Sequence, residues 1–273
     1  PLAVRISNPN LKRSVSSNIS ADISFRRKHH QQNVSLGLGI NTTRNNMGTR
    51  TTYNRATGAY TYMNDNVKGG NWSVNTWSGF TRTLDKAQHL TIDQRLSYNY
   101  SRSTDFDIAY DEAATQLSRV NTSVLGEKLM FNYQKDNFNA SCSGNLSWRH
   151  STSNRANFES LNTYDFDYGV TLSCRLPLDI TLATDLRQYS RRGYGERSIN
   201  TDDLVWNASL TRSFAKGKWV LKADVFDLLH QLSNTTYTVN AQGRTEVWHN
   251  TIPSYGMLHL SYKFNKMPKG KKK

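Results

Sequence analysis

The sequence predicts an all-β fold, and within that class an antiparallel transmembrane β-barrel. Three observations support this prediction: apolar and polar residues alternate along most of the chain, many alternating segments reach ten residues, and short turns alternate with long polar loops. Alternation with a period of two gives a strand one apolar face and one polar face. Such long strands are unusual in soluble sheets.

The alternation is clearest in residues 164–188, on either side of a turn at Pro177. There Tyr164, Phe166 and Tyr168 open an apolar series that interleaves with a series of Asp, Gly, Thr and Arg. Applied to the whole chain, the same rule predicts about eleven strands: residues 15–25, 34–44, 72–84, 88–102, 125–135, 137–150, 164–176, 178–188, 204–214, 218–228 and 252–264.

The connections between these strands are of two kinds that alternate. The short turns are residues 28–32, 85–88, 135–137, 176–178 and 215–218. The long polar loops lie near residues 45–70, 103–123, 151–163, 189–203 and 229–250. A meander with short connections at one end and long connections at the other is typical of a sheet whose two ends face different compartments. Bacterial outer-membrane barrels have this layout, with short periplasmic turns and long outside loops.

A soluble β-sandwich or β-propeller is the alternative all-β fold. Its turns have no reason to sort into short and long, which favours the barrel. The mean hydropathy of -0.69 does not exclude a membrane, because a barrel pairs its backbone between strands and needs only alternate residues to be apolar. The sequence contains no run of 18 apolar residues, so it predicts no transmembrane helix.

Aromatic residues fall toward strand ends on the outward, apolar parity, where a membrane–water interface would lie. They are Phe25, Trp72, Tyr100, Trp148, Trp206 and Trp219. Three polar residues, Arg82, Gln94 and Glu127, fall on the same parity. Gln94 lies in the middle of its strand, which indicates a local bulge, an oligomer contact or a different register.

The net charge of +14 raises the question of a nucleic-acid partner. Apart from the final "KMPKGKKK", however, Lys and Arg are scattered singly and interleaved with Asp. Because a nucleic-acid-binding surface gathers its basic residues on one face or stripe, we expect no nucleic-acid partner. The chain begins with Pro rather than Met, so we expect a mature terminus or a piece of a longer protein.

No residue pattern indicates catalysis, and we expect no enzyme activity, cofactor or metal. The seven histidines show no metal-ligand spacing. His259 and Ser261 lie on one face of a strand at roughly 7 Å, without a third partner. Cys142 and Cys174 both fall in strands. They are interpreted as small apolar side chains, with a cross-strand disulfide as the alternative.

Charged residues gather on the inward parity and are the candidate lumen-facing site. The candidates are Arg175, Asp179, Asp185, Arg187, Lys222 and Asp224. They are typical of a hydrated wall held by mixed-charge pairs. The sharper hypothesis is that some of them contact a plug or line a solute path.

The last predicted strand contains an apolar series at every second position, ending on an aromatic residue. The series is Leu258, Leu260, Tyr262 and Phe264. It is similar to the C-terminal signal that the outer-membrane barrel-assembly machinery recognises, except that nine residues follow Phe264. We therefore expect residues 1–264 to be barrel and residues 265–273 to be a basic periplasmic tail.

A family resemblance rests on "KADVFDLLHQ" at 222–231, "PSYGMLHLSYKF" at 253–264 and "TTYNRATGAYTYMNDNVKGGNWSVN" at 51–75. These segments resemble the barrels of TonB-dependent-receptor-type outer-membrane proteins from Bacteroidetes. The resemblance implies a barrel of about twenty-two strands, of which about eleven are half, and an N-terminal plug. No plug or TonB box is visible in these residues.

The resemblance implies an outer-membrane receptor or transporter that captures a solute on its outer loops and admits it through a plugged barrel. Expected partners are outer-membrane lipid, the barrel-assembly machinery, an unidentified solute, a surface lipoprotein, and the TonB complex through an upstream region. The loops are rich in Tyr, Asn, Thr and Arg, which can bind sugars or peptides or remain solvated. The alternatives are a structural or adhesive barrel without transport, and an outer-membrane hydrolase.

Overall fold

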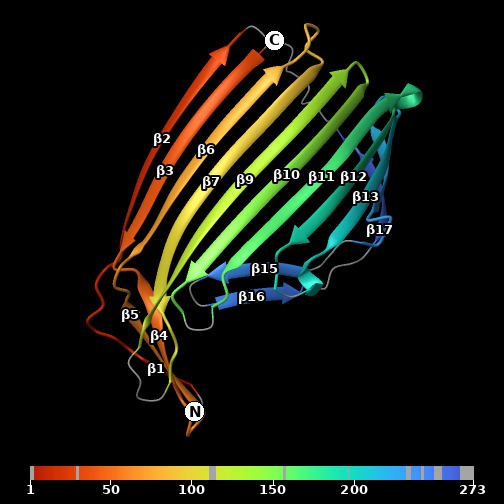
Figure 1. Cartoon of the computed structure of the whole chain (residues 1–273). Coiled ribbons are helices and arrows are strands. Elements are labelled where there is room, and N and C mark those ends of the chain that lie inside the picture. Colours follow the sequence, from red (N-terminus) through yellow and green to blue (C-terminus); the bar gives the residue numbers. More distant parts are fainter. Residues whose placement is uncertain are drawn as a thin grey trace, which may run out of the picture.

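The computed structural model describes residues 3–28, 31–110, 115–155, 158–195, 197–231, 235–240, 243–248 and 254–264. Most of these residues lie in strands, and the largest element is an eleven-stranded antiparallel sheet (Figure 1). Its strands are β2 (Val15–Arg27), β3 (Gln32–Arg44), β6 (Asn71–Thr83), β7 (Leu90–Phe106), β9 (Leu117–Lys135), β10 (Phe138–Ser153), β11 (Leu161–Leu176), β12 (Ile180–Arg192), β13 (Asp202–Phe214), β14 (Trp219–Phe226) and β17 (Tyr255–Tyr262).

The sheet is a meander with the order β17-β14-β13-β12-β11-β10-β9-β7-β6-β3-β2. Each of the eleven predicted strands is present, so the all-β antiparallel prediction is confirmed. The two outermost strands, β2 and β17, each pair with one neighbour among the described residues, and no closed barrel is found. Short turns lie at one end of the sheet and long connections at the other, which we call the turn end and the loop end (Figure 1).

Three of the predicted long loops contain strands, which corrects the sequence-based expectation. A four-stranded sheet with the order β1-β5-β4-β8 projects beyond the loop end (Figure 1). Its strands are β1 (Ala3–Ile6), β4 (Met47–Asn54), β5 (Ala59–Asn66) and β8 (Ala109–Tyr110). We call it the loop-end sheet. A separate hairpin is formed by β15 (Thr235–Asn240) and β16 (Gly243–Trp248).

The β4–β5 hairpin forms because its turn has the necessary side chains. The side-chain oxygen of Asn54 accepts hydrogen bonds from the backbone N–H groups of Ala56 and Thr57, at 2.9 and 3.0 Å. Gly58 has a φ of 67°, a conformation that glycine adopts without steric cost. Asx turns followed by glycine are typical of chain reversals. The reversal therefore lies within a stretch that was expected to be a loop.

Turn chemistry also sets where strands begin and end at the turn end. Pro177–Asp179 form a 3-10 turn (η2) in which Leu178 and Asp179 have φ of 65° and 54°. As a result β12 begins at Ile180, two residues later than predicted, and Asp179 is a turn residue rather than a strand residue. Between β6 and β7, Asp85 accepts the backbone N–H groups of His89 and Leu90, at 3.0 and 2.8 Å. The Leu90 hydrogen bond lowers the pKa of Asp85 most.

The register gives the sheet two continuous and unlike faces. Leu172 on β11 lies opposite Ala140 and Thr184, whereas its neighbour Ser173 lies opposite Asn139 and Ala183. Extended across the sheet, this pairing places the large apolar side chains on one face and most polar ones on the other. The apolar face includes Ile19, Ile23, Leu36, Leu38, Leu96, Leu129, Leu146, Val170, Leu172, Leu182, Leu186, Leu210, Leu221, Leu258 and Leu260, all of them exposed.

The buried apolar core is small and lies toward the loop end. Its members are Val67, Ala109, Val120, Leu161, Ile199 and Val205. A β-sandwich buries one face of each sheet against the other. Within the described residues no second sheet packs on the apolar face of the main sheet.

The sequence outliers on the apolar face are real features of the structure. Gln94 pairs with Phe80 and Leu129 in an unbroken register, so neither a bulge nor a different register explains its position. Cys142 and Cys174 lie on the same face of adjacent strands, but Cys142 is opposite Val170 and both cysteines are free. Four residues of strand separate the two thiols by roughly 13 Å, beyond disulfide reach.

Candidate functional site: the polar face and the loop-end sheet

Five of the six predicted site residues lie on strands of the polar face. They are Arg175, Asp185, Arg187, Lys222 and Asp224. The sixth, Asp179, lies in the turn after β11, where its carboxylate accepts a hydrogen bond from Arg175 Nη2 at 2.8 Å. Both side chains of that pair are more than half exposed. The six residues therefore form separate local groups rather than one cluster.

Arg187 is the centre of a hydrogen-bonded network that crosses three strands. Its guanidinium forms an ion pair with Asp167 on β11 and donates to the hydroxyl of Ser143 on β10 at 2.6 Å. Asn145 donates to the same carboxylate at 2.8 Å. Gly169 makes room for this arrangement, because a Cβ there would lie 2.6 Å from the Leu186 carbonyl oxygen and 2.9 Å from Arg187 Cα. The network fixes the polar face locally.

Asp224 is the most buried acid among the candidates, at 6% exposed. Lys222 Nζ lies 2.7 Å from one of its carboxylate oxygens, and His259 Nε2 lies 3.2 Å from the other. The second contact joins β14 to the edge strand β17. In the described structure, no hydrogen bond joins Ser261 to His259, whose Nε2 faces Asp224.

A shallow depression of about 190 Å³ lies between Asp185 and Asp224 on the polar face. Thr171, Asn207 and Ser209 also line it, and Thr171 donates to Asp185 at 2.8 Å. Asp224 is paired with Lys222 and His259, and Asp185 accepts from Thr171, so both carboxylates beside this depression have partners within the chain.

Charges of both signs lie on the polar face. Arg95 on β7 and Lys128 on β9 lie directly opposite each other, as a basic pair. The acids Asp165, Asp167, Asp185, Asp203 and Asp224 lie on the strands from β11 to β14. Arg175, Arg187, Arg191 and Lys222 lie on the same face of these strands, and Asp93 lies two residues from Arg95 on β7, so charges of both signs are interleaved across the face.

The loop-end sheet carries a tyrosine cluster on one of its faces. Tyr60 and Tyr62 stack with ring centroids 6.0 Å apart and an angle of 12° between planes. Tyr53 contacts Tyr60 at 4.7 Å and Tyr110 at 6.2 Å. A groove of about 490 Å³ beside this cluster is lined by Thr49, Thr51, Tyr60, Tyr62, Phe106, Asp107, Ile108 and Arg155.

The groove combines flat apolar rings with fixed hydrogen-bonding groups. Arg155 Nε lies 3.1 Å from the Asp107 carboxylate. On the other face of the hairpin, Arg50 donates to Asp65 at 2.8 Å and its guanidinium lies 5.2 Å from the Phe106 ring centroid. These contacts attach the hairpin to the end of β7. Tyrosine rings next to hydroxyl, carboxylate and guanidinium groups favour a polar ligand with one flat apolar side.

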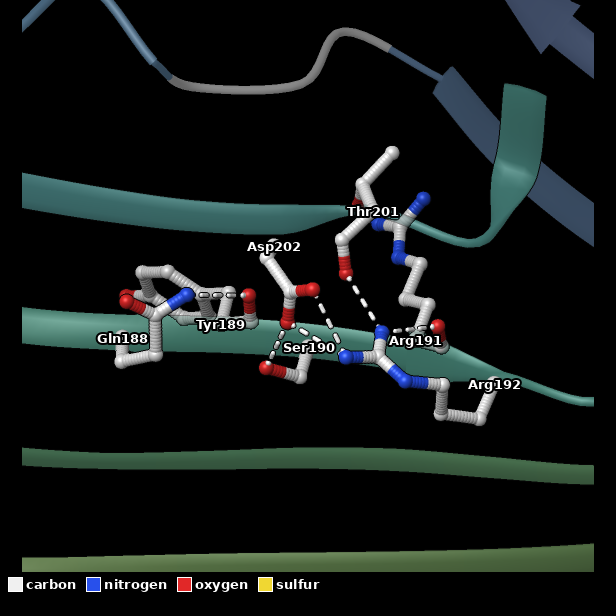
Figure 2. Close-up of polar contacts among 7 residues, drawn as sticks. All are labelled: Gln188, Tyr189, Ser190, Arg191, Arg192, Thr201 and Asp202. Carbon is white, nitrogen blue, oxygen red and sulfur yellow. Dashed lines mark hydrogen bonds and ion pairs between the residues drawn. The ribbon is translucent and has the colours of Figure 1, made fainter. Parts of the chain in front are cut away.

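A second polar cluster lies at the loop end of β12 and β13 (Figure 2). Two nitrogen–oxygen contacts of 2.8 and 2.7 Å join Arg192 Nη2 to the carboxylate of Asp202, and Ser190 donates to the same carboxylate at 2.6 Å. Arg192 Nη1 also donates to the carbonyl oxygens of Arg191 and Thr201, at 2.8 and 3.1 Å. The Arg192 guanidinium therefore stabilises the connection between β12 and β13.

Tyr194 closes this connection on the polar side. Its hydroxyl lies 2.9 Å from each carboxylate oxygen of Asp165. Partial burial, together with the negative charge of Asp165, raises the pKa of Tyr194 to about 12. The phenol therefore stays protonated and acts as a hydrogen-bond donor at physiological pH.

The sequence indicated part of this site and missed part. Asp165 and Asp167 had the inward parity but were not singled out. In the structure Asp165 lies opposite Arg191, whereas Asp167 lies opposite Tyr189 and forms a diagonal ion pair with Arg187. The tyrosines of the loop-end sheet were recognised only as loop composition. The signal that could have located them is the alternation of Thr49, Thr51 and Tyr53 before an Asn-x-x-x-Gly turn.

Among the described residues, no three His, Cys, Asp or Glu side chains are grouped as metal ligands. The described part of the chain also contains no helix that is long and apolar enough to cross a bilayer. Comparison with known proteins identifies no relative: no protein-family model, curated protein or solved structure matches this chain.

Proposed function

We propose that this chain is part of an outer-membrane β-barrel of the TonB-dependent receptor type, which captures a solute at its loop end and admits it through a plugged barrel. The observation that supports this proposal most directly is the exposed apolar face of the eleven-stranded sheet. Each fully buried Leu or Ile side chain contributes about 1.5–3 kcal/mol relative to exposure in water. A face with many such residues is stable only against an apolar medium or partner.

The aromatic residues on the apolar face have the spacing of two membrane interfaces. Near the turn end, Phe214, Trp219 and Tyr262 lie side by side on neighbouring strands. On β10, Phe138 and Trp148 lie ten residues apart on the apolar face. Ten residues at about 3.3 Å span about 33 Å along the strand, or about 25 Å vertically at a tilt near 40°. This height equals the apolar band of outer-membrane barrels.

The two free edges support the idea that further strands complete the barrel. Unpaired backbone N–H and C=O groups of β2 and β17 would each cost several kcal/mol in hydrocarbon. We propose that other strands of the whole protein pair with both edges. The resemblance of residues 222–231 and 253–264 to TonB-dependent receptors implies the same closure.

The loop end supports capture of a ligand. The tyrosine-lined groove offers stacking surfaces, and the hydroxyl, carboxylate and guanidinium groups of Thr49, Asp107 and Arg155 offer hydrogen bonds. The polar face would line the interior of the barrel and contact water, the plug or the passing solute.

Membrane placement is tested by quenching tryptophan fluorescence in the full-length protein. Two variants retain a single tryptophan, either Trp206 on the apolar face or Trp77 on the polar face. We expect bromine-labelled lipids to quench Trp206 strongly and Trp77 weakly. Equal quenching of the two, or a protein that stays monodisperse without detergent, would contradict the proposal.

Capture and uptake are tested separately on cells. A panel of labelled oligosaccharides and oligopeptides is applied to cells that express the full-length protein, with and without the proton gradient that energises TonB. We expect surface binding that Tyr60→Ala and Tyr62→Ala reduce, and uptake that requires the gradient. Binding without uptake would favour the structural or adhesive alternative.

A further inference from the structure

The apolar face is interrupted at one place, midway along strands β6 to β10. Gln94 on β7 and Glu127 on β9 meet there, with Gln94 Nε2 at 3.4 Å from Glu127 Oε1. Ser78 on β6 and Gly144 on β10 flank them on the same face, opposite Leu96 and Leu129 respectively. We call Ser78, Gln94, Glu127 and Gly144 the apolar-face patch.

Gln94 is the deepest polar residue of the patch. It lies opposite Leu129 on β9, which is four residues from Leu125, the partner of Trp148 at the loop-end interface, and six residues from Lys135 at the turn end. At about 3.3 Å per residue and a tilt near 40°, these separations are about 10 and about 15 Å in height. Glu127 lies two residues closer to the loop-end interface, so Gln94 is the residue that cannot reach the aqueous phase.

Their outward direction is fixed by the backbone. The register of β6, β7 and β9 is unbroken through the patch, so both side chains face the medium that contacts the apolar face. The mutual hydrogen bond uses one amide N–H of Gln94 and one carboxylate oxygen of Glu127. In the described structure, the remaining N–H, the amide oxygen and the second carboxylate oxygen make no hydrogen bond. Polar groups at such depth are costly unless a partner satisfies them.

We propose that the apolar-face patch is the centre of a symmetric contact between two copies of this chain inside the membrane. This inference rests on the proposed function. A two-fold contact requires a surface that is complementary to itself. The patch meets this requirement because it offers both donors and acceptors: Gln94 of each copy would donate to Glu127 of the other.

The surroundings of the patch fit close approach of a second sheet. Gly144 and Ser78 have little or no side chain, and small residues let membrane-embedded backbones approach. Leu96, Leu129 and Leu146 surround the polar pair and would exclude lipid from it. A different partner with a single Lys or Arg would satisfy Glu127 but would leave Gln94 without a partner.

The contact is tested by cross-linking in native outer membranes. The full-length protein carries Leu129→Cys, on a strand next to the proposed two-fold axis between β7 and β9, together with Cys142→Ser and Cys174→Ser, and is treated with a short bis-maleimide. We expect a cross-linked dimer, and at least a tenfold lower yield of it when Gln94→Leu and Glu127→Leu are added. The matched control, Leu210→Ala on a distant part of the apolar face, should leave the yield unchanged.

Three results would overturn the inference: absence of the dimer, a dimer yield that the double replacement leaves unchanged, or cross-linking only to a different protein. The Trp206 quenching measurement separates the two levels of the proposal. Strong quenching without a dimer refutes the two-fold contact alone, whereas loss of quenching refutes membrane placement and the contact with it.

Discussion

The two faces of the eleven-stranded sheet are built from the same strands but are completed in different ways. On the polar face, Arg187 and Asp167 bond to each other and are 17% and 20% exposed. On the apolar face of the same two strands, Leu172 and Leu186 are 38% and 42% exposed. This polar pair is therefore satisfied within the chain, whereas the described residues supply no second layer that covers the apolar face. Substitutions on the two faces should therefore reduce the yield or stability of the folded protein for different physical reasons.

The largest expected effect comes from a charge on the apolar face. Val170→Arg should sharply reduce the amount of folded protein in the proposed outer membrane. Val170 lies opposite Cys142, near the middle of the span between Phe138 and Trp148, and a lipid-facing Arg near the midplane costs about 2–4 kcal/mol. Leu258→Arg on β17, four residues from Tyr262, should act in the same way. Ser173→Arg and Ser261→Arg, on the polar face of the same strands, are the controls. Folded protein is measured by its shifted gel mobility before heating, and equal yields of all four would show that the faces are wrongly assigned.

The next effect tests the network around Arg187. Arg187→Met leaves Asp167 partly buried without its ion-pair partner, and should lower the free energy of unfolding by about 1–3 kcal/mol. Arg175→Met removes an exposed pair with Asp179 and should cost less than about 1 kcal/mol. Urea unfolding in lipid vesicles measures both values. If the two replacements cost the same, the polar face is not organised around Arg187.

A glycine comparison tests how closely strands approach on each face. Gly169→Ala should cost about 1–3 kcal/mol of unfolding free energy, because its Cβ would meet the backbone of Leu186 and Arg187. Gly144→Ala on the apolar face is the control, since its nearest atoms would be 3.6 and 3.9 Å away. The same urea experiment applies, and a smaller cost at Gly169 than at Gly144 would contradict the packing described above.

The smallest effect concerns the Tyr194–Asp165 contact. Tyr194→Phe should lower the free energy of unfolding by about 1 kcal/mol at neutral pH. Because the folded pKa of Tyr194 is raised to about 12, this contribution is complete below the ordinary tyrosine pKa near 10. It is lost as the pH rises through the folded value. Ultraviolet pH titrations of the two proteins should therefore differ by one tyrosine that ionises near pH 12. If Tyr194→Phe instead removes a tyrosine that ionises near pH 10, the contact is contradicted.

The eleven strands of the main sheet, their order and their two faces could be predicted from the sequence, because they follow from a period of two and from turn lengths, whereas the strands of the loop-end sheet and the β15–β16 hairpin were missed. Leu172 and Ser173, for example, were predicted on opposite faces and lie on opposite faces in the structure. Strand ends could not be predicted as well, since they depend on single backbone angles. Asp179 was expected on a strand and lies in a turn with a positive φ.

The site was less accessible to sequence reasoning than the fold. Which charges meet depends on register, and the partners of Arg187 come from β10 and β11, more than twenty residues away in one case. The tyrosine cluster depends on β8 pairing with β4, which brings Tyr110 beside Tyr53 although the two are far apart in the sequence. The odd or even position of a residue along its strand predicts which face its side chain is on, but it does not predict which side chains it contacts. The predicted basic tail, residues 265–273, lies outside the described residues.

The free edges of β2 and β17 have a consequence for the order of assembly. If this sheet enters a bilayer, its edge backbone groups must find partners before hydrocarbon surrounds them. Zipping of strands and insertion would then be a single concerted event, and β17 could not be threaded into lipid alone. A catalyst that temporarily pairs with the β17 backbone would lower the barrier to insertion, because it would satisfy the β17 N–H and C=O groups until the partner strand pairs with them.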